Sequence, residues 1–255
     1  INSGVDAIKI QTLVKALGND LATGTVSLSS NASPAIDLST SAPDENSKLT
    51  AAVSNFVDAN NTNKSDKTFS NTASFQWQTS SDGLTWTNIL GDNAKAAYFI
   101  LTQAEVGRQV RALIKNTDEK GFDEYLASAA TLAVKNVNQE PAGSISIGVS
   151  NNGELKQGSL MNIISNTLTD TDGMGTLSYQ WQSGSNVDTR WTDIQGATAD
   201  TYQLTQAEVG KQVRLKASYT DGQGTPETVF SAATTAAGVG NVNDPPQGDV
   251  LINRQ

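Results

Sequence analysis

Apolar and polar residues alternate along several short segments of this chain. Residues 213–219 place Val, Leu, Ala and Tyr at every second position, with Arg, Lys and Ser between them. Residues 110–114 show the same alternation. A period of two is typical of a β-strand with one buried face. The Asp-Gly pairs at 82–83 and 221–222 are hairpin signals, so we expect short strands joined by tight turns.

The chain also contains an internal repeat of about 105 residues. The heptapeptide Leu-Thr-Gln-Ala-Glu-Val-Gly occurs at 101–107 and again at 204–210. Flanking matches keep the copies in register: Phe75-Gln-Trp77-Gln with Tyr179-Gln-Trp181-Gln, and Asn136-Val-Asn138 with Asn241-Val-Asn243. Such self-similarity at a fixed spacing indicates a tandem array of domains.

The repeat predicts the domain organisation. We expect one complete unit at 32–138, with an insertion near 61–71 that the second unit lacks, and another complete unit at 139–243. Residues 1–31 are expected to be the C-terminal part of a preceding, divergent repeat. Residues 244–255 are expected to be the first strand of a following repeat. We interpret the chain as an internal fragment of a longer polypeptide.

Several short strands and turns within about 100 residues predict an all-β fold of antiparallel β-sandwiches arranged end to end. In each repeat a Thr-x-x-Glu sequence, Thr102 to Glu105 and Thr205 to Glu208, has the spacing of a capping box. We therefore expect a single helical turn before the alternating strand.

This arrangement resembles the crossover into strand F of immunoglobulin-like domains. The resemblance implies that Trp77 and Trp181 are the buried core tryptophans, packed without a disulfide. Trp86 and Trp191 are expected to pack on a sheet, with an exposed sugar-stacking face as the alternative.

Composition narrows the possible chemistry. The 255 residues include no Cys and no His, which excludes Ser-His-Asp and Cys-His nucleophiles, thiol redox pairs and ordinary zinc sites. The 17 basic and 26 acidic side chains give a net charge of −9, which argues against nucleic acid as a partner. No segment approaches the roughly 18 consecutive apolar residues of a membrane-spanning helix, so no membrane insertion is expected. Cations that prefer carboxylate oxygens remain possible ligands.

The repeat motifs resemble a known family. Tyr179-Gln-Trp-Gln, Trp191-Thr-Asp-Ile-Gln-Gly-Ala-Thr, the shared heptapeptide, Tyr219-Thr-Asp-Gly and Asn241-Val-Asn-Asp-Pro-Pro are similar to the immunoglobulin-like tandem repeats of giant bacterial surface adhesins and biofilm-matrix proteins. Those proteins are exported by type I secretion. The resemblance covers residues 32–243 well and residues 1–31 poorly. It implies an extracellular location, at the bacterial cell surface or secreted.

A second resemblance concerns the junctions between repeats. Asn241-Val-Asn-Asp-Pro-Pro is similar to the calcium-binding linker of cadherins, with Asn241 in place of the first Asp. Calcium takes six to eight oxygen ligands from carboxylates, amides and carbonyls. Candidate ligands lie in the linkers, at the crossover turns and in the loops where the chain enters a repeat. They are Glu105, Asn136, Asn138, Glu140, Asp170, Asp172 and Asp221 for the central junction, and Glu208, Asn241, Asn243 and Asp244 for the following one.

The same Asp and Asn residues are also common turn formers, and that alternative stays open. The junction before the first full repeat offers less: the linker Asn31-Ala-Ser-Pro34 lacks acid, and the nearby loops offer Asp58, Asn60 and Asp118. Weak calcium binding is expected there.

Three functions fit these observations. The first is a structural extender of an adhesin, with neighbouring repeats of the same polypeptide as partners and calcium rigidifying the joints. The second is a carbohydrate- or cell-binding module that stacks exposed aromatic residues on surface glycans. The third is a self-assembling surface-layer or filament subunit, with contacts through the insertion or through residues 8–17. An enzyme is not expected, since the hydroxyl residues lie in no nucleophile motif.

Overall fold

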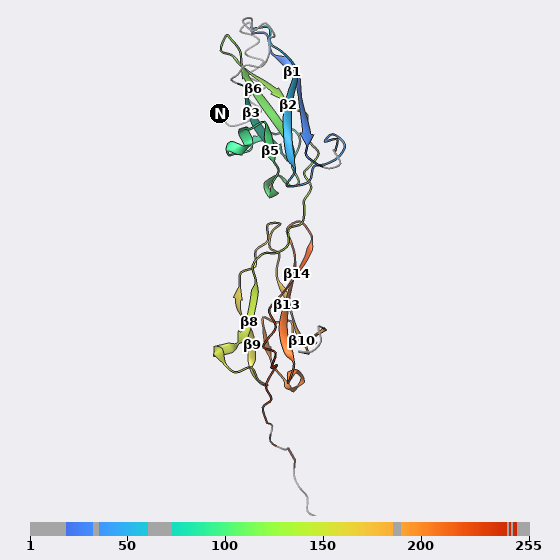
Figure 1. The fold of residues 1–255 in the computed structure, drawn as a ribbon, viewed down its shortest axis with the longest axis vertical. Coiled ribbons are helices and arrows are strands. Elements are labelled where there is room, and N and C mark those ends of the chain that lie inside the picture. The colour runs from blue at the N-terminus through green and yellow to red at the C-terminus, as the bar shows by residue number, and fades with distance from the viewer. Residues whose placement is uncertain are drawn as a thin grey trace, which may run out of the picture. The chain divides into compact units, whose positions relative to one another are not determined.

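The computed structural model describes residues 19–32, 36–60, 73–185, 190–243, 245 and 247–248 (Figure 1). The described residues form strands and four short 3₁₀ helices, so the all-β prediction is confirmed. The chain divides into two compact units, Ile1–Val137 and Asn138–Gln255, and each is described by itself below. Among the described residues, no helix is long and apolar enough to cross a membrane.

The first unit contains two antiparallel sheets. One has the strand order β1-β2-β5 and the other the order β4-β3-β6-β7. The strands are β1 (Thr23–Ser30), β2 (Lys48–Val57), β3 (Ser74–Ser80), β4 (Thr87–Asn88), β5 (Tyr98–Ile100), β6 (Gln109–Thr117) and β7 (Asp123–Ala127), with 3₁₀ helices η1 (Asp92–Lys95) and η2 (Gln103–Glu105).

The second unit repeats this plan with sheets β12-β9-β8 and β11-β10-β13-β14. The strands are β8 (Ile145–Val149), β9 (Leu160–Asn166), β10 (Ser178–Gly184), β11 (Trp191–Asp193), β12 (Thr201–Gln203), β13 (Gln212–Thr220) and β14 (Pro226–Phe230), with η3 (Ser150–Asn152) and η4 (Gln206–Glu208). The predicted hairpins at 82–83 and 221–222 join β3 to β4 and β13 to β14.

A buried tryptophan lies at the centre of each unit, as predicted. Trp77 and Trp181 are both fully buried. Trp77 stacks on Phe99 with ring centroids 5.8 Å apart, and Trp181 packs against Tyr202 at 6.1 Å. Each indole N–H donates to a backbone carbonyl, so the one polar atom of the ring is satisfied inside the core. Replacing such a side chain with alanine costs about 3–5 kcal/mol.

The predicted capping boxes are also confirmed. In the first unit Glu105 Oε2 accepts from the Thr102 backbone N–H at 2.9 Å, while Thr102 Oγ1 accepts from the Ala104 N–H at 3.3 Å. Thr205 and Glu208 repeat the arrangement. Each box orders one turn of 3₁₀ helix directly before the long alternating strand.

The assignment of residues 1–31 to a preceding repeat is wrong for its described strand. Residues Thr23–Ser30 form β1, which pairs with β2 along most of its length and belongs to the first unit. The error came from assuming a constant offset between repeats. The loop from β1 to β2 covers 31–47, whereas the loop from β8 to β9 covers 150–159, so the offset changes along the chain. Residues 1–18 and the insertion at 61–71 lie outside the described residues.

Candidate metal centres

Three acidic side chains of the second unit converge at the end where its chain begins. Asp170 lies in the loop between β9 and β10, Asp221 in the turn between β13 and β14, and Glu227 on β14. Each offers one carboxylate oxygen, and these oxygens lie within 4.8 Å of one another. Three separate elements therefore supply one acidic cluster, which we call the second cluster.

The turn that carries Asp221 uses only one of its oxygens. Asp221 Oδ1 accepts from the backbone N–H groups of Gln223 and Thr225 at 2.9 and 2.7 Å. This is the turn-forming role expected of aspartate. Asp221 Oδ2 is buried and has no hydrogen-bond partner among the described residues. Turn formation and ligand binding are thus compatible in one residue.

A glycine allows the two loops of the second cluster to approach. A Cβ atom on Gly222 would lie 2.6 Å from the backbone oxygen of Asp172, which is too close for any other residue. Instead the Gly222 N–H donates to the Gly173 carbonyl at 3.0 Å. This contact holds the Asp170 loop beside the Asp221 turn.

The first residues of the second unit are bonded to the same acids. Asn138 Nδ2 donates to Glu227 Oε1 at 2.8 Å, and the Gln139 backbone N–H donates to Asp172 Oδ2 at 2.7 Å. Asp172 is itself placed by its backbone N–H, which donates to Asp170 Oδ1 at 2.8 Å. The linker residues are therefore part of the cluster's hydrogen-bond network.

Tyr219 closes one side of the second cluster. Its hydroxyl donates to Asp170 Oδ2. Burial, reinforced by this hydrogen bond, raises the pKa of Tyr219 above its ordinary value. The phenol remains a donor to Asp170 at neutral pH as a result.

The first unit holds an equivalent set, which we call the first cluster. Asp58, Asp118 and Glu124 are at most 5% exposed, and their carboxylate oxygens lie within 4.8 Å of one another. One oxygen of each residue remains buried with no partner among the described residues: Asp58 Oδ2, Asp118 Oδ2 and Glu124 Oε2. Unpaired buried carboxylate oxygens are costly, and a cation is the partner that such a set lacks.

The other oxygens of the first cluster hold the fold. Asp118 Oδ1 accepts from the backbone N–H groups of Lys120 and Phe122, and Asp58 Oδ1 accepts from the Asn60 N–H at 2.8 Å. Glu124 Oε1 accepts from Asn19 Nδ2 at 2.8 Å.

The charges of the first cluster are not balanced by the fold. Burial, followed by the charge of Asp58, raises the pKa of Glu124 to about 7. Burial is also the main cause that raises the pKa of Asp58, and the charge of Asp118 adds to it. Both shifts have the direction expected for acids taken from water and placed beside other acids.

The two clusters correspond position by position. The pairs, first unit before second, are Asn19 with Asn138, Asp58 with Asp170, Asn60 with Asp172, Asp118 with Asp221, and Glu124 with Glu227. The linker contact of the first cluster thus comes from Asn19, and Asn31-Ala-Ser-Pro34 was the wrong place to expect it.

Sequence reasoning named some of these residues and missed others. It brought Asn138, Asp170, Asp172 and Asp221 together, as the structure does. It missed Glu124, Glu227 and Asn19. The available signal was an Asp in the hairpin turn followed by a Glu at the same spacing in both repeats, 118 to 124 and 221 to 227.

The remaining predicted ligands lie elsewhere. Glu105 and Glu208 are buried in the capping boxes, each with Oε2 accepting from a threonine. Asn136 belongs to the first unit, and Glu140 is an exposed residue after the linker. Their part in a metal site stays a prediction. So does that of Asn241 and Asn243, which are exposed, and of Asp244, which lies outside the described residues.

The donor set of each cluster suits a hard divalent cation. Carboxylate and amide oxygens from several elements, without nitrogen or sulfur ligands, are typical of calcium sites. The buried oxygens without a hydrogen-bond partner show that the residues present fit such an ion. Asp58, Asp118 and Glu124 would hold it in the first unit, and Asp170, Asp221 and Glu227 in the second.

The tryptophans proposed for sugar stacking are covered by arginine. Trp86 is 6% exposed, and the Arg111 guanidinium lies 4.2 Å from its ring centroid. Arg214 lies 4.3 Å from the ring of Trp191, which is partly buried. Trp86 therefore offers no free face to a sugar ring.

Comparison with known proteins gives few matches. A family model described as a domain of unknown function (DUF8696) matches residues 151–237, within the second unit. No curated protein matches the chain.

Three solved structures are similar at low sequence identity. A tetra-tandem repeat from the extending region of a large adhesion protein is 12% identical, with a TM-score of 0.28, over 85% of this chain and 50% of that chain. A Ca²⁺-stabilised adhesin that helps an Antarctic bacterium reach out and bind ice is 9% identical, with a TM-score of 0.27, over 88% and 50%. Domains from titin are 12% identical, with a TM-score of 0.27, over 76% and 58%. The chain spans about half the length of the two adhesin structures.

Proposed function

We propose that this chain is part of the extender region of a large secreted bacterial surface adhesin. In this proposal the repeats act outside the cell as structural spacers, and their partners are the neighbouring repeats of the same polypeptide. Calcium binds at the start of each repeat and rigidifies its junction with the repeat before it. The tandem repeat motifs and their resemblance to adhesin repeats support the structural role.

The observation that carries the calcium proposal is the divided use of the acidic side chains. Asp118 and Asp221 each hold a turn through Oδ1 and keep a buried Oδ2 without a partner among the described residues. Acids that only formed turns would have no reason to bury a second oxygen beside other acids, because that burial disfavours the charged form. A divalent ion would remove this cost and would stabilise the folded unit by mass action.

The hydrogen bonds to the linker connect the ion to the junction. Asn138 and Gln139, the first residues of the second unit, are bonded to Glu227 and Asp172. Without the ion, repulsion among the acids loosens the elements that hold these two residues. With the ion, the acids and the linker bonded to them are fixed together. Calcium binding and junction stiffness are therefore thermodynamically linked.

A calcium titration of the chain tests this proposal. We expect calcium to raise the melting temperature and to reduce the spread of end-to-end distances in single-molecule fluorescence. Glu227→Gln should lose the stabilisation of the second unit while keeping an acceptor for Asn138. Glu154→Gln is the matched control, since it removes the same charge from an exposed pair with Lys156 in the same unit. If calcium changes neither the melting temperature nor the hydrodynamic radius, the proposal is wrong.

A further inference from the structure

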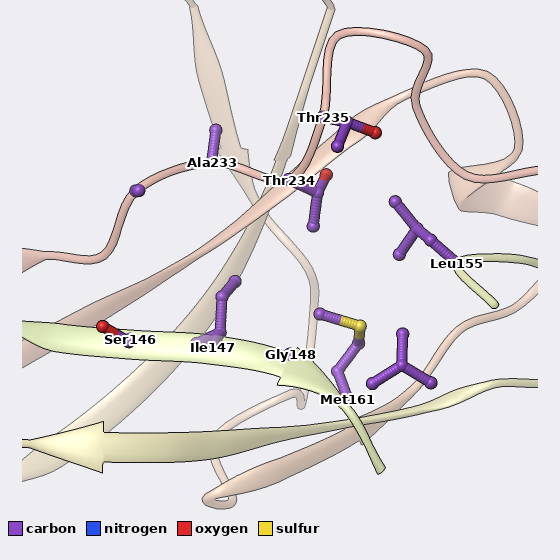
Figure 2. Close-up of a pocket in the computed structure, with 10 residues that line it drawn as sticks. Ser146, Ile147, Gly148, Leu155, Met161, Ala233, Thr234 and Thr235 are labelled. Atoms are coloured by element: carbon purple, nitrogen blue, oxygen red, sulfur yellow. The ribbon is translucent and has the colours of Figure 1, made fainter. Parts of the chain in front are cut away.

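The second unit contains an apolar cavity of about 370 Å³ that is far from the acidic side chains in sequence and separate from them in lining. It lies between the edge strand β8 and the segment 232–235 (Figure 2). Ile147, Leu155 and Met161 line it from different elements, with Thr234 facing them across the opening. Its size is in the range of sites that bind small molecules or peptide side chains.

The equivalent place in the first unit can be located from hydrogen bonds and strand pairs. Thr131 Oγ1 accepts from the Val110 N–H, and Thr234 Oγ1 accepts from the Val213 N–H, so Thr131 and Thr234 correspond. The next residues, Leu132 and Thr235, therefore also correspond.

The facing strands agree with this assignment. Leu49 pairs with Phe99 in the first unit, and Met161 pairs with Tyr202 in the second. Since Phe99 and Tyr202 follow the repeat, Leu49 corresponds to Met161. The cavity of the second unit thus matches the space beside Leu49 and Leu132 in the first.

The first unit fills this space with its own chain. Leu38, from the long loop between β1 and β2, is 8% exposed and belongs to the hydrophobic core. Its backbone carbonyl accepts from the Leu132 N–H at 3.4 Å. A leucine side chain and a peptide carbonyl together cover the gap between the two sheet edges.

The second unit has no such segment. Its loop between β8 and β9 is shorter, and among the described residues no backbone carbonyl accepts from the Thr235 N–H. Ile147, Val149 and Leu155 remain only partly buried around the cavity. The donor and the apolar walls that hold Leu38 in one repeat are both present, uncovered, in the other.

We propose that this cavity is a docking site for a peptide segment of a partner protein, which inserts a leucine-sized aliphatic side chain and accepts a hydrogen bond from the Thr235 N–H. A peptide is the occupant because the first unit fills the same space with one, through the same pair of contacts. Recognition at an exposed sheet edge by backbone bonds and one side-chain pocket is a known mode of peptide binding. This proposal is independent of calcium.

The two methionines allow a direct test on the full chain. Met161 lines the cavity and is 1% exposed, whereas Met174 is 40% exposed in the loop before β10. We would label the methionine methyl groups with ¹³C and add a peptide with the sequence of residues 36–41, Ile-Asp-Leu-Ser-Thr-Ser. We expect a saturable shift of the Met161 signal and none for Met174. A peptide with Asp in place of the leucine is the control and should leave both signals unchanged.

Two variants sharpen the test. Val149→Asp places a charge on the cavity wall and should abolish the shift. Thr235→Pro removes the N–H donor and should weaken binding by roughly 2- to 10-fold, the value of one hydrogen bond. The Met174 signal and the calcium response of each variant report that it is folded.

The proposal is overturned if the leucine peptide leaves Met161 unmoved, or if the aspartate peptide moves it equally. A Met161 shift that depends on protein concentration without peptide would assign the cavity to a second copy of the chain. A shift caused by an aliphatic alcohol but not by the peptide would assign it to a small apolar ligand. Either result also contradicts the proposal.

Discussion

The two acidic clusters share a scaffold and differ in charge. The second cluster and its neighbouring loop bring four acids together, Asp170, Asp172, Asp221 and Glu227. The first cluster brings three, because Asn60 stands where the second has Asp172. The Lys120 ammonium donates to Asn60 Oδ1 at 3.0 Å, and the corresponding residue of the second unit is the neutral Gln223.

This difference shows how one backbone plan can give two affinities. The turn, the loop and the linker asparagine are common to both units, so the geometry of the oxygens is set by the fold. The charge at the site is set by two positions next to it. Since calcium affinity follows the number of charged ligands, we expect the second unit to bind calcium more tightly than the first.

The largest expected effect breaks the other difference between the units, the filled and open sheet edges. Leu38→Ala should lower the free energy of unfolding of the first unit by about 3 kcal/mol, because it empties a core position. Hydrogen–deuterium exchange, read peptide by peptide, would assign the loss to the first unit. Leu84→Ala is the control, since Leu84 is 83% exposed in the same unit and should have little effect. An equal loss in both variants would contradict the role of Leu38.

The next effect removes the charge difference. The double variant Asn60→Asp with Lys120→Gln gives the first cluster the charges of the second, and should raise its calcium affinity by about 10- to 100-fold. Asp172→Asn should lower the affinity of the second unit. Isothermal titration calorimetry would measure both. Asp92→Asn with Lys95→Gln, an exposed pair of the first unit, should leave the affinity unchanged.

Acidity should separate calcium-free and calcium-bound forms of the first unit. The pKa of Glu124 in the metal-free unit is about 7, above its ordinary value of 4.5, so the folded state holds this proton more tightly. The contribution of Glu124 to metal-free stability therefore rises as pH falls from about 7 to 4.5. Calcium must displace the proton, so its affinity should fall roughly tenfold from pH 8 to pH 6.

Titrations with calcium at several pH values, and melting curves in a chelator, would measure these opposite trends. Glu124→Gln should remove the dependence of metal-free stability on pH over this interval. Retention of the full dependence in that variant would assign it to another group.

The smallest expected effect concerns the tyrosine that closes the second cluster. Tyr219→Phe removes the hydrogen bond to Asp170 and should cost the metal-free second unit about 1 kcal/mol. Chemical denaturation in a chelator would detect it. In calcium the cost should shrink, because the ion takes over the Asp170 oxygen. A cost that is the same with and without calcium would show that Asp170 is not a ligand.

Much of the fold follows from the sequence because the repeat marks it twice. The strand alternation, the core tryptophans and the capping boxes each depend on local spacing, and both copies agree. The domain boundary before the first unit failed because loop length is free to vary between repeats. β1 and β8 occupy the same place in their sheets but do not lie at the same offset as the tryptophans.

The site was predicted only where loops announced it. Asp170, Asp172 and Asp221 stand in Gly-rich turns, where an acid attracts notice. Glu124 and Glu227 stand in strands, where a glutamate at a polar position is ordinary. Both are buried on the inward side of their strands, and only the pairing of β7 and β14 with their neighbours places them beside the aspartates.

The bonds from the linker to the acids also define a load path. A pull on the chain before the second unit reaches Asn138 and Gln139 first, and passes through them to Glu227 and Asp172 before it reaches β8. An ion held by those acids would act as a clamp ahead of the first strand. We therefore expect the rupture force of this unit under tension, and the order in which its strands peel away, to depend on calcium concentration.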